Sequence, residues 1–215
     1  MYVPRHFAFP EDALSELHDL IEDQTFAILV APGDGSHDPE HGLQAVHLPL
    51  VLDRAAGPYG TLAGHVARAN PVWRTLDPHR EVLVICQGPH GYVSPDWYAS
   101  PGLVPTWNYV VVHCYGTPRL VDDPAATLGH LRQLSALAEE RLLPKPPWTL
   151  DKIKPATLAT LIRQIVAFRI EITRIEGKRK LNQNRSAADR AGVIQALEGS
   201  ERGDDLAIAE AMRRL

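Results

Sequence analysis

A run from Tyr59 to Pro71 combines a histidine, an arginine and an asparagine where a strand should give way to a helix. His65 falls in a stretch with a period of two, which is typical of a strand. Arg68 follows, and Asn70 before Pro71 is the usual order of a cap and a first-turn proline. Because a helix start offers unpaired N–H groups, His65 and Arg68 beside it could bind an anion such as phosphate. From these residues alone, a tight corner built only for close packing is the preferred alternative.

A second stretch with ligand chemistry is Ala45 to Pro49, in which His47 and Leu48 precede a proline. A proline inside a strand removes one ladder donor and belongs at an edge, at a bulge or beside a ligand. Backbone groups left unpaired there could serve a planar ligand. An ordinary edge strand with a half-buried His47 is the preferred alternative.

Aromatic and polar residues are densest between Gln87 and Tyr98. The Gly-Pro pair after Gln87 is expected to break the preceding strand after Cys86, and the aromatic side chains could stack on a ring or roof a core. A serine, a histidine and an aspartate occur in the same run, but local adjacency does not build a catalytic triad. With no Gly-x-Ser-x-Gly elbow present, a hydrolase is not favoured.

Two later runs could also bind a polar ligand. Trp107 and Asn108 enter a strand with a donor amide between two aromatic residues, although packing would explain them equally well. Lys178 and Lys180 belong to a basic and amide-rich run from Gly177 to Arg185. This run suits a phosphate, a partner subunit or solvent alone.

Composition excludes several classes of function. His37 and His41 lie four residues apart, but the surrounding glycines and prolines argue against a helix that would align them, so no metal site is predicted. The net charge of −4 supplies no global field for nucleic acid, so any DNA contact would need a local basic patch. The two cysteines lie in apolar runs, and no apolar run approaches the length of a membrane span. A cytoplasmic protein with no membrane contact is expected.

The elements that must position these residues are mainly strands. Strands are expected at 26–31, 43–53, 59–66, 81–86, 107–121 and 165–175, with a mobile hairpin loop at 32–42. Helices are expected after Pro10, from 122 to about 142, at 155–161, from Ser186 and at 204–215. Because few helices separate the strands, we predict a mainly β fold with peripheral helices (α+β) whose sheet is an antiparallel barrel. A single domain over 1–215 would carry inserted helices at about 124–161 and a C-terminal helical tail at about 186–215.

Several short runs in this order resemble one known family. They are Met1–Pro4, His47–Pro49, Gly60–Leu62, Gly64–His65, Ala67–Pro71, Gln87–Pro89, Tyr92–Pro95, Trp97–Tyr98, Val104–Tyr109, Gly177–Lys178, Lys180–Leu181 and Gln183–Asn184. Together they resemble the PaiB-like proteins, FMN-binding negative transcriptional regulators with the FMN-binding split-barrel fold. Two positions depart from the family pattern, because Val46 replaces an expected threonine and Cys86 an aromatic residue. Losing the threonine hydroxyl removes a possible donor to flavin and would lower the affinity.

The resemblance implies a homodimer in which each FMN lies between subunits. It assigns His65, Arg68 and Asn70 to the phosphate, His47 and Leu48 to the ring edge, Gln87, Trp107 and Asn108 to other polar and stacking contacts, and Lys178 and Lys180 to contacts from the partner subunit. The implied function is negative transcriptional regulation. A flavin-dependent oxidoreductase with an unknown small-molecule substrate is the alternative, and a haem binder on the same barrel is a third. No helix-turn-helix is recognised, so direct DNA recognition has little support from the sequence.

Overall fold

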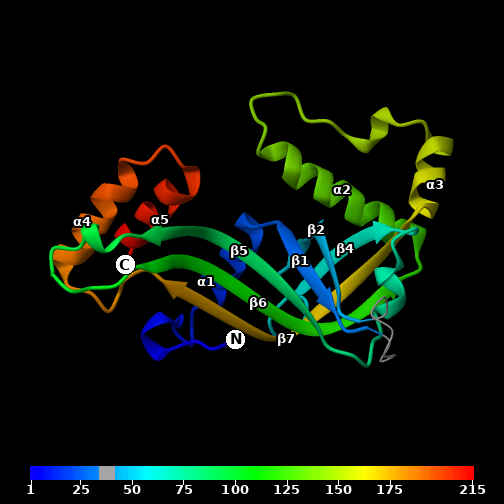
Figure 1. Cartoon of the computed structure of the whole chain (residues 1–215). Helices are drawn as coiled ribbons and strands as arrows, with labels where there is room; N and C mark the ends of the chain where they lie inside the picture. The colour runs from blue at the N-terminus through cyan, green and yellow to red at the C-terminus, as the bar shows by residue number, and fades with distance from the viewer. Residues whose placement is uncertain (34–41) are drawn as a thin grey trace. The chain divides into compact units, whose positions relative to one another are not determined.

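The computed structural model describes residues 1–33 and 42–215 (Figure 1). Its strands are β1 (Phe26–Ala31), β2 (Gln44–Pro49), β3 (Val51–Asp53), β4 (Thr61–Ala67), β5 (Val82–Val93), β6 (Thr106–Val121) and β7 (Ile165–Lys180). Its α-helices are α1 (Leu14–Asp23), α2 (Pro124–Glu140), α3 (Pro155–Arg163), α4 (Ala187–Glu198) and α5 (Gly203–Arg213). Most of the predicted hairpin loop lies outside the described residues, as do His37 and His41.

The strands form one sheet in the order β2-β1-β5-β6-β7-β4-β3. β1 pairs antiparallel with β2 and β5, and β4 pairs antiparallel with β3 and β7. Within the described residues the sheet is not closed, and it ends at β2 and β3. The prediction of a mainly antiparallel sheet accompanied by helices is therefore confirmed.

The predicted single strand at 43–53 is wrong, because the chain forms two strands there. Pro49 ends β2 and has no N–H to donate to a ladder. Leu50 then turns inward, where it is only 4% exposed, and its N–H donates to the carbonyl oxygen of Thr25 at 2.8 Å. The proline and the buried leucine therefore separate the two edge strands, β2 and β3.

The Gly-Pro pair does not break β5, contrary to prediction. β5 continues through Gly88 and Pro89 to Val93. β1 pairs with β5 only as far as Ile85, so beyond that residue one side of β5 has no β1 partner. A proline is tolerated on an unpaired strand edge because its missing N–H costs no ladder bond.

β7 also extends further than predicted, to Lys180 instead of residue 175. Gly177 lets α1 and the N-terminal arm approach this part of the strand, since a Cβ at Gly177 would lie 2.6 Å from Cδ2 of Phe9 and would overlap Leu17. Arg179 lies over the Phe9 ring at 4.6 Å and donates to Glu16 at 3.1 Å. Part of the predicted basic tail is therefore strand.

The chain divides into two compact units. Unit 1 comprises residues 1–20, 87–113 and 176–215, and unit 2 comprises residues 21–86 and 114–175. In unit 1, α4 and α5 pack together beside the end of β5 (Figure 1), and their core includes Val93, Val193 and Ile208. In unit 2, α2 and α3 lie together on one side of the strands.

Helix starts are the best predicted local features. Asp123 accepts hydrogen bonds from the N–H groups of Ala125 and Ala126 at 2.9 and 3.3 Å, which caps α2. Ser186 caps α4 by accepting from the Asp189 N–H at 3.1 Å. α2 itself is largely uncovered, because Thr127 is its one buried residue.

No helix in the described part of the chain is long and apolar enough to cross a membrane.

Candidate functional site

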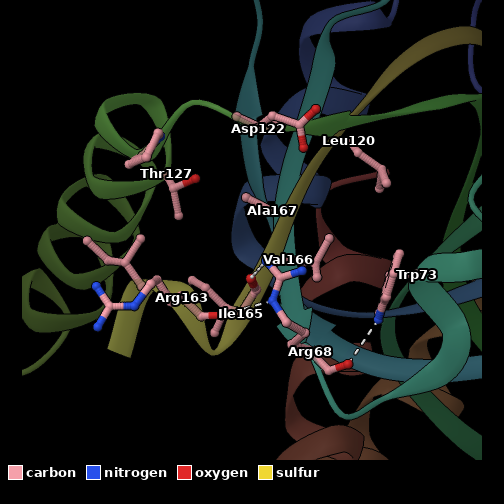
Figure 2. Close-up of a pocket in the computed structure, with 12 residues that line it drawn as sticks. Arg68, Trp73, Leu120, Asp122, Thr127, Arg163, Ile165, Val166 and Ala167 are labelled. Atoms are coloured by element: carbon pink, nitrogen blue, oxygen red, sulfur yellow. Dashed lines mark hydrogen bonds between the residues drawn. The ribbon is translucent and has the colours of Figure 1, made fainter. Parts of the chain in front are cut away.

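Arg68 directly follows β4 and is held at the junction between α3 and β7 (Figure 2). Its Nε donates to the carbonyl oxygen of Arg163 at 2.8 Å, and its Nη2 donates to that of Ile165 at 3.0 Å. The last carbonyls of a helix lack partners within the helix, so a guanidinium group stabilises them. The indole of Trp73 donates to the Arg68 carbonyl oxygen at 3.0 Å. These bonds fix both the backbone and the guanidinium group of Arg68.

The positive charge of Arg68 is not neutralised by these contacts, because both acceptors are neutral carbonyls. The side chain of Arg163 beside it donates to the hydroxyl of Thr160 at 3.1 Å. Neither arginine forms an ion pair with an acid among the residues that the structure describes, and Nη1 of Arg68 makes no hydrogen bond there. A planar guanidinium group with free N–H donors suits a phosphate or a carboxylate.

The two arginines line a pocket of about 280 Å³ in unit 2. Its other walls come from η3 (Pro71–Thr75), the end of β6, the start of α2 and the start of β7, through Trp73, Leu120, Val121, Asp122, Pro124, Thr127, Ile162, Ile165, Val166 and Ala167. In Figure 2 the Asp122 carboxylate lies on the side away from Arg68. The pocket thus has a cationic end, and more of its lining surface is polar than apolar.

Asn70 begins a short helix, as predicted. Its Oδ1 accepts the N–H of Val72 at 3.0 Å and caps η3, in which Pro71 is the first residue. The Asn70 N–H donates to the carbonyl oxygen of Ala67 at 2.9 Å. The cap therefore fixes the turn that carries Arg68 from β4 into the pocket wall.

His65 lies on β4, where it contacts His130 of α2. Nδ1 of His65 and Nε2 of His130 are 3.0 Å apart, with the rings edge to face. Burial lowers the pKa of His65 below its usual value. Burial, which is the largest cause, and the positive charges of His65 and Arg169 together lower the pKa of His130 to about 4. Both imidazoles are therefore neutral at pH 7.

His47 and Leu48 lie on the edge strand β2, as predicted for a strand that contains a proline. The exposed His47 ring stacks on Phe26 with 6.2 Å between ring centroids. Leu48 is buried and stands opposite Ala27 in the ladder. Both residues belong to unit 2.

The two predicted lysines lie in unit 1. Lys178 is buried, donates to the Tyr2 carbonyl oxygen at 3.1 Å and lies 5.3 Å from the centre of the Tyr109 ring. Lys180 donates to the hydroxyl of Thr106 and, at 2.9 Å, to the Trp107 carbonyl oxygen. Burial lowers the pKa of Lys180, and the positive charges of Lys178 and Arg185 add to this. Unit 1 thus has a cationic cluster of its own.

Trp107 and Asn108 lie on opposite faces of β6, because successive side chains of a strand alternate. The Trp107 ring is 51% exposed and stacks on His90, whose Nδ1 lies 3.3 Å from the amide nitrogen of the exposed Gln87. Asn108 is fully buried against α5, where its Nδ2 donates to the sulfur of Met212 at 3.3 Å. Of these residues, Trp107 and Gln87 are open to a ligand.

A family described as "Putative FMN-binding domain" matches residues 1–174, which include β1 to β6, the Arg68 corner and most of β7. The chain belongs to this FMN-binding family. This membership supports FMN, the cofactor expected from the sequence. It also supports the resemblance to PaiB-like proteins, since a relative from Bacillus subtilis named "Protease synthase and sporulation protein PAI 2" is 32% identical over 99% of this chain and 96% of its own length.

A further relative and two solved structures are also similar to this chain. An uncharacterized protein of Aspergillus fumigatus is 31% identical over 89% of this chain and 90% of its own length. The FAD- and haem-binding protein of Mycobacterium smegmatis has a TM-score of 0.54 and 17% identity, covering 82% of this chain and 76% of its own. The flavocytochrome Anf3 of Azotobacter vinelandii has a TM-score of 0.54 and 15% identity, covering 96% and 78% of the two chains. At these identities the two structures show a shared fold.

The residues of the Arg68 pocket fit the phosphate end of FMN. Small-molecule sites usually enclose roughly 300 to 1,000 Å³, so a pocket of about 280 Å³ suits part of a flavin nucleotide better than the whole. No acid among residues 1–33 and 42–215 pairs with Arg68, and its orientation is fixed, which are properties that favour phosphate binding.

Sequence reasoning missed three residues of this region: Trp73, His130 and Arg163. Trp73 follows Asn70 by three residues, and a tryptophan so close to a helix cap could have been included in the corner. Arg163 ends α3, two residues beyond the helix predicted at 155–161, and a basic residue near a helix end is ordinary. His130 lies in the middle of α2, far from β4 in the sequence, and no spacing connects it with His65.

Proposed function

We propose that this protein is an FMN-binding split-barrel protein that binds the FMN phosphate in the Arg68 pocket. The supporting observation is a guanidinium group held by two backbone carbonyls, with free N–H donors and no acidic partner among the described residues. Arg163 adds a second positive charge to the same pocket. When bound, FMN would supply redox chemistry at its ring, and the residues described here bind and orient it.

The other contacts of the flavin follow from the same proposal. The ribityl chain would extend from the phosphate pocket, and His47 and Leu48 would serve the ring edge through the backbone of β2. Gln87 and Trp107 are exposed and would provide an amide donor and a stacking surface. Asn108 is fully buried, so its effect on the ring would be indirect. In the proposed homodimer, Lys178 and Lys180 of the partner subunit would add positive charge near the phosphate.

Purified protein freed of flavin is expected to quench FMN fluorescence to saturation at micromolar concentrations, because a charge-assisted phosphate contact and ring stacking both contribute to binding. Light scattering during the same titration reports the mass of the complex. A flavin site between subunits predicts a dimer that becomes more stable to dilution when FMN is bound. Absence of quenching would refute FMN binding, and saturable binding to a stable monomer would refute the site between subunits.

We infer that the protein acts as a negative transcriptional regulator, with flavin binding as its ligand-sensing step. The support comes from the family resemblance and from the name of the B. subtilis relative. The structure adds one constraint, because Lys178, Arg179 and Lys180 are already bonded to Tyr2, Glu16 and Thr106. This basic cluster is therefore occupied by internal contacts, and regulation need not use it to bind DNA.

A mobility-shift assay with DNA from upstream of the gene separates the two routes of regulation. If regulation is indirect, the purified protein shifts specific and unrelated DNA equally weakly, and raising the salt concentration abolishes both shifts. Sequence-selective binding that persists at physiological salt would contradict the indirect route. Steady consumption of NAD(P)H by the FMN-loaded protein would contradict a purely regulatory function.

A further inference from the structure

The contact between His65 and His130 requires one proton between two nitrogens. Nδ1 of His65 and Nε2 of His130 are 3.0 Å apart, which is a normal hydrogen-bond distance. A neutral imidazole carries one N–H and one acceptor nitrogen, and both rings are neutral at pH 7. One ring must therefore donate and the other accept.

The surroundings of His130 decide which ring donates. Nδ1 of His130 is sealed from solvent and has no hydrogen-bond partner among the described residues. If His65 donated, the proton of His130 would lie on this sealed Nδ1, leaving a buried N–H without an acceptor, which is rare in proteins. If His130 donates from Nε2, its Nδ1 carries only a lone pair. The second arrangement places the proton of His65 on Nε2.

The His65 Nε2 position differs from His130 Nδ1 in being open. It makes no hydrogen bond to any residue that the structure describes. Unlike Nδ1 of His130, it is not sealed from solvent. We propose that His130 is a positioning residue which, by donating to Nδ1, holds His65 as a neutral imidazole with an accessible Nε2–H for an oxyanion ligand.

This donor lies beside the Arg68 pocket. His65 stands opposite Ala167 in the β4–β7 ladder, so the two side chains share a face, and Ala167 lines the pocket. Thr127, one helical turn before His130 on α2, also lines it. The ligand class is therefore an oxyanion in this pocket, and its identity as the phosphate of FMN rests on the proposed function.

Burial lowers the pKa of both rings, and nearby positive charge adds to this at His130. Arg169 of β7 is the charged residue whose field lowers the pKa of His130, and the positive charge on either imidazole would disfavour protonation of the other. In the wild type, the lowered pKa of His65 therefore favours the uncharged donor over the protonated ring. The arginines supply the positive charge of the pocket, and His65 supplies an N–H donor of fixed orientation.

Long-range nitrogen–carbon NMR of the histidine rings in the flavin-free protein tests the tautomer directly. We expect His65 to carry its proton on Nε2 in the wild type. His130→Gln should retain this state, because the glutamine amide can also donate to Nδ1, whereas His130→Ala should give a mixture of tautomers and a His65 pKa nearer its usual value. A wild-type His65 protonated on Nδ1, or a tautomer unchanged in His130→Ala, would overturn the proposal. If His130→Ala does not fold, the His65 tautomers of the wild type and of His130→Gln still test the proposal.

FMN titrations at pH 8 and pH 6 supply the ligand readout. In His130→Ala the freed His65 titrates near its usual pKa of about 6.5 and gains a positive charge as the pH falls. The ratio of FMN affinity at pH 6 to that at pH 8 should therefore exceed the wild-type ratio by several-fold, with His130→Gln close to the wild type. An equal ratio in all three proteins would overturn the proposed role toward the ligand. No binding by the wild type would instead refute FMN as the ligand, while the NMR result would stand by itself.

Discussion

Replacing Arg68 by alanine is expected to weaken FMN binding by about 10- to 100-fold, because hydrogen bonds to a charged group contribute about 1.5 to 3 kcal/mol. Its loss should cost less in folding, since the two bonds to the carbonyls of Arg163 and Ile165 are exposed to solvent. We expect the free energy of unfolding to fall by about 1 kcal/mol. Fluorescence titration and urea denaturation measure the two effects on the same samples.

Two variants serve as controls for this result. Arg68→Lys keeps the charge but loses the planar fork, so its FMN affinity should lie between those of the wild type and Arg68→Ala. Arg202 is 70% exposed and belongs to unit 1, and Arg202→Ala should leave both affinity and stability unchanged. A loss of stability as large as the loss of binding in Arg68→Ala would indicate that the corner only packs α3 against β7.

Replacing Gly116 by alanine is expected to destabilise the protein by about 3 kcal/mol or more, the upper range for overpacking. An added Cβ would overlap the carbonyl oxygen of Glu171 and lie 2.9 Å from its carbonyl carbon. These atoms belong to the backbone of β7, which cannot rotate away as a side chain can. Because the start of β7 forms a wall of the Arg68 pocket, weaker FMN binding should accompany the loss of stability.

Gly129 provides a matched substitution in the same unit. It lies within α2, and an added Cβ there meets nothing within 4 Å. Gly129→Ala should therefore stabilise the protein by about 0.5 to 1 kcal/mol, the usual difference between glycine and alanine in a helix. The urea denaturation midpoints of both variants test this explanation. Equal stability of Gly116→Ala and Gly129→Ala would contradict it.

Local sequence signals predict the strands and helix starts well, because they depend on neighbouring residues. Asn70, Asp123 and Ser186 cap helices where their sequence contexts indicate. Strand ends are predicted less well, because they depend on partners distant in the sequence. Neither the passage of β5 through Pro89 nor the extension of β7 to Lys180 could be inferred without knowing which strands and helices lie alongside.

In the candidate site too, features set by neighbouring residues are predicted and those set by distant residues are not. The phosphate-like corner around Arg68 is visible in the sequence, because a strand, a cap and a proline are consecutive there. The carbonyls that hold Arg68 come from the end of α3 and the start of β7, almost a hundred residues later, and His130 comes from α2. The opposite faces of Trp107 and Asn108 were predictable, since strand alternation alone separates neighbouring side chains.

The most direct test compares FMN with riboflavin, which is the same flavin without the phosphate. If the Arg68 pocket binds the phosphate, wild-type protein should prefer FMN over riboflavin by about 10- to 100-fold, the contribution expected of charge-assisted hydrogen bonds. In Arg68→Ala that preference should largely disappear, through weaker FMN binding with riboflavin affinity unchanged. An equal affinity of the wild type for both flavins, or a preference that survives in Arg68→Ala, would contradict the account.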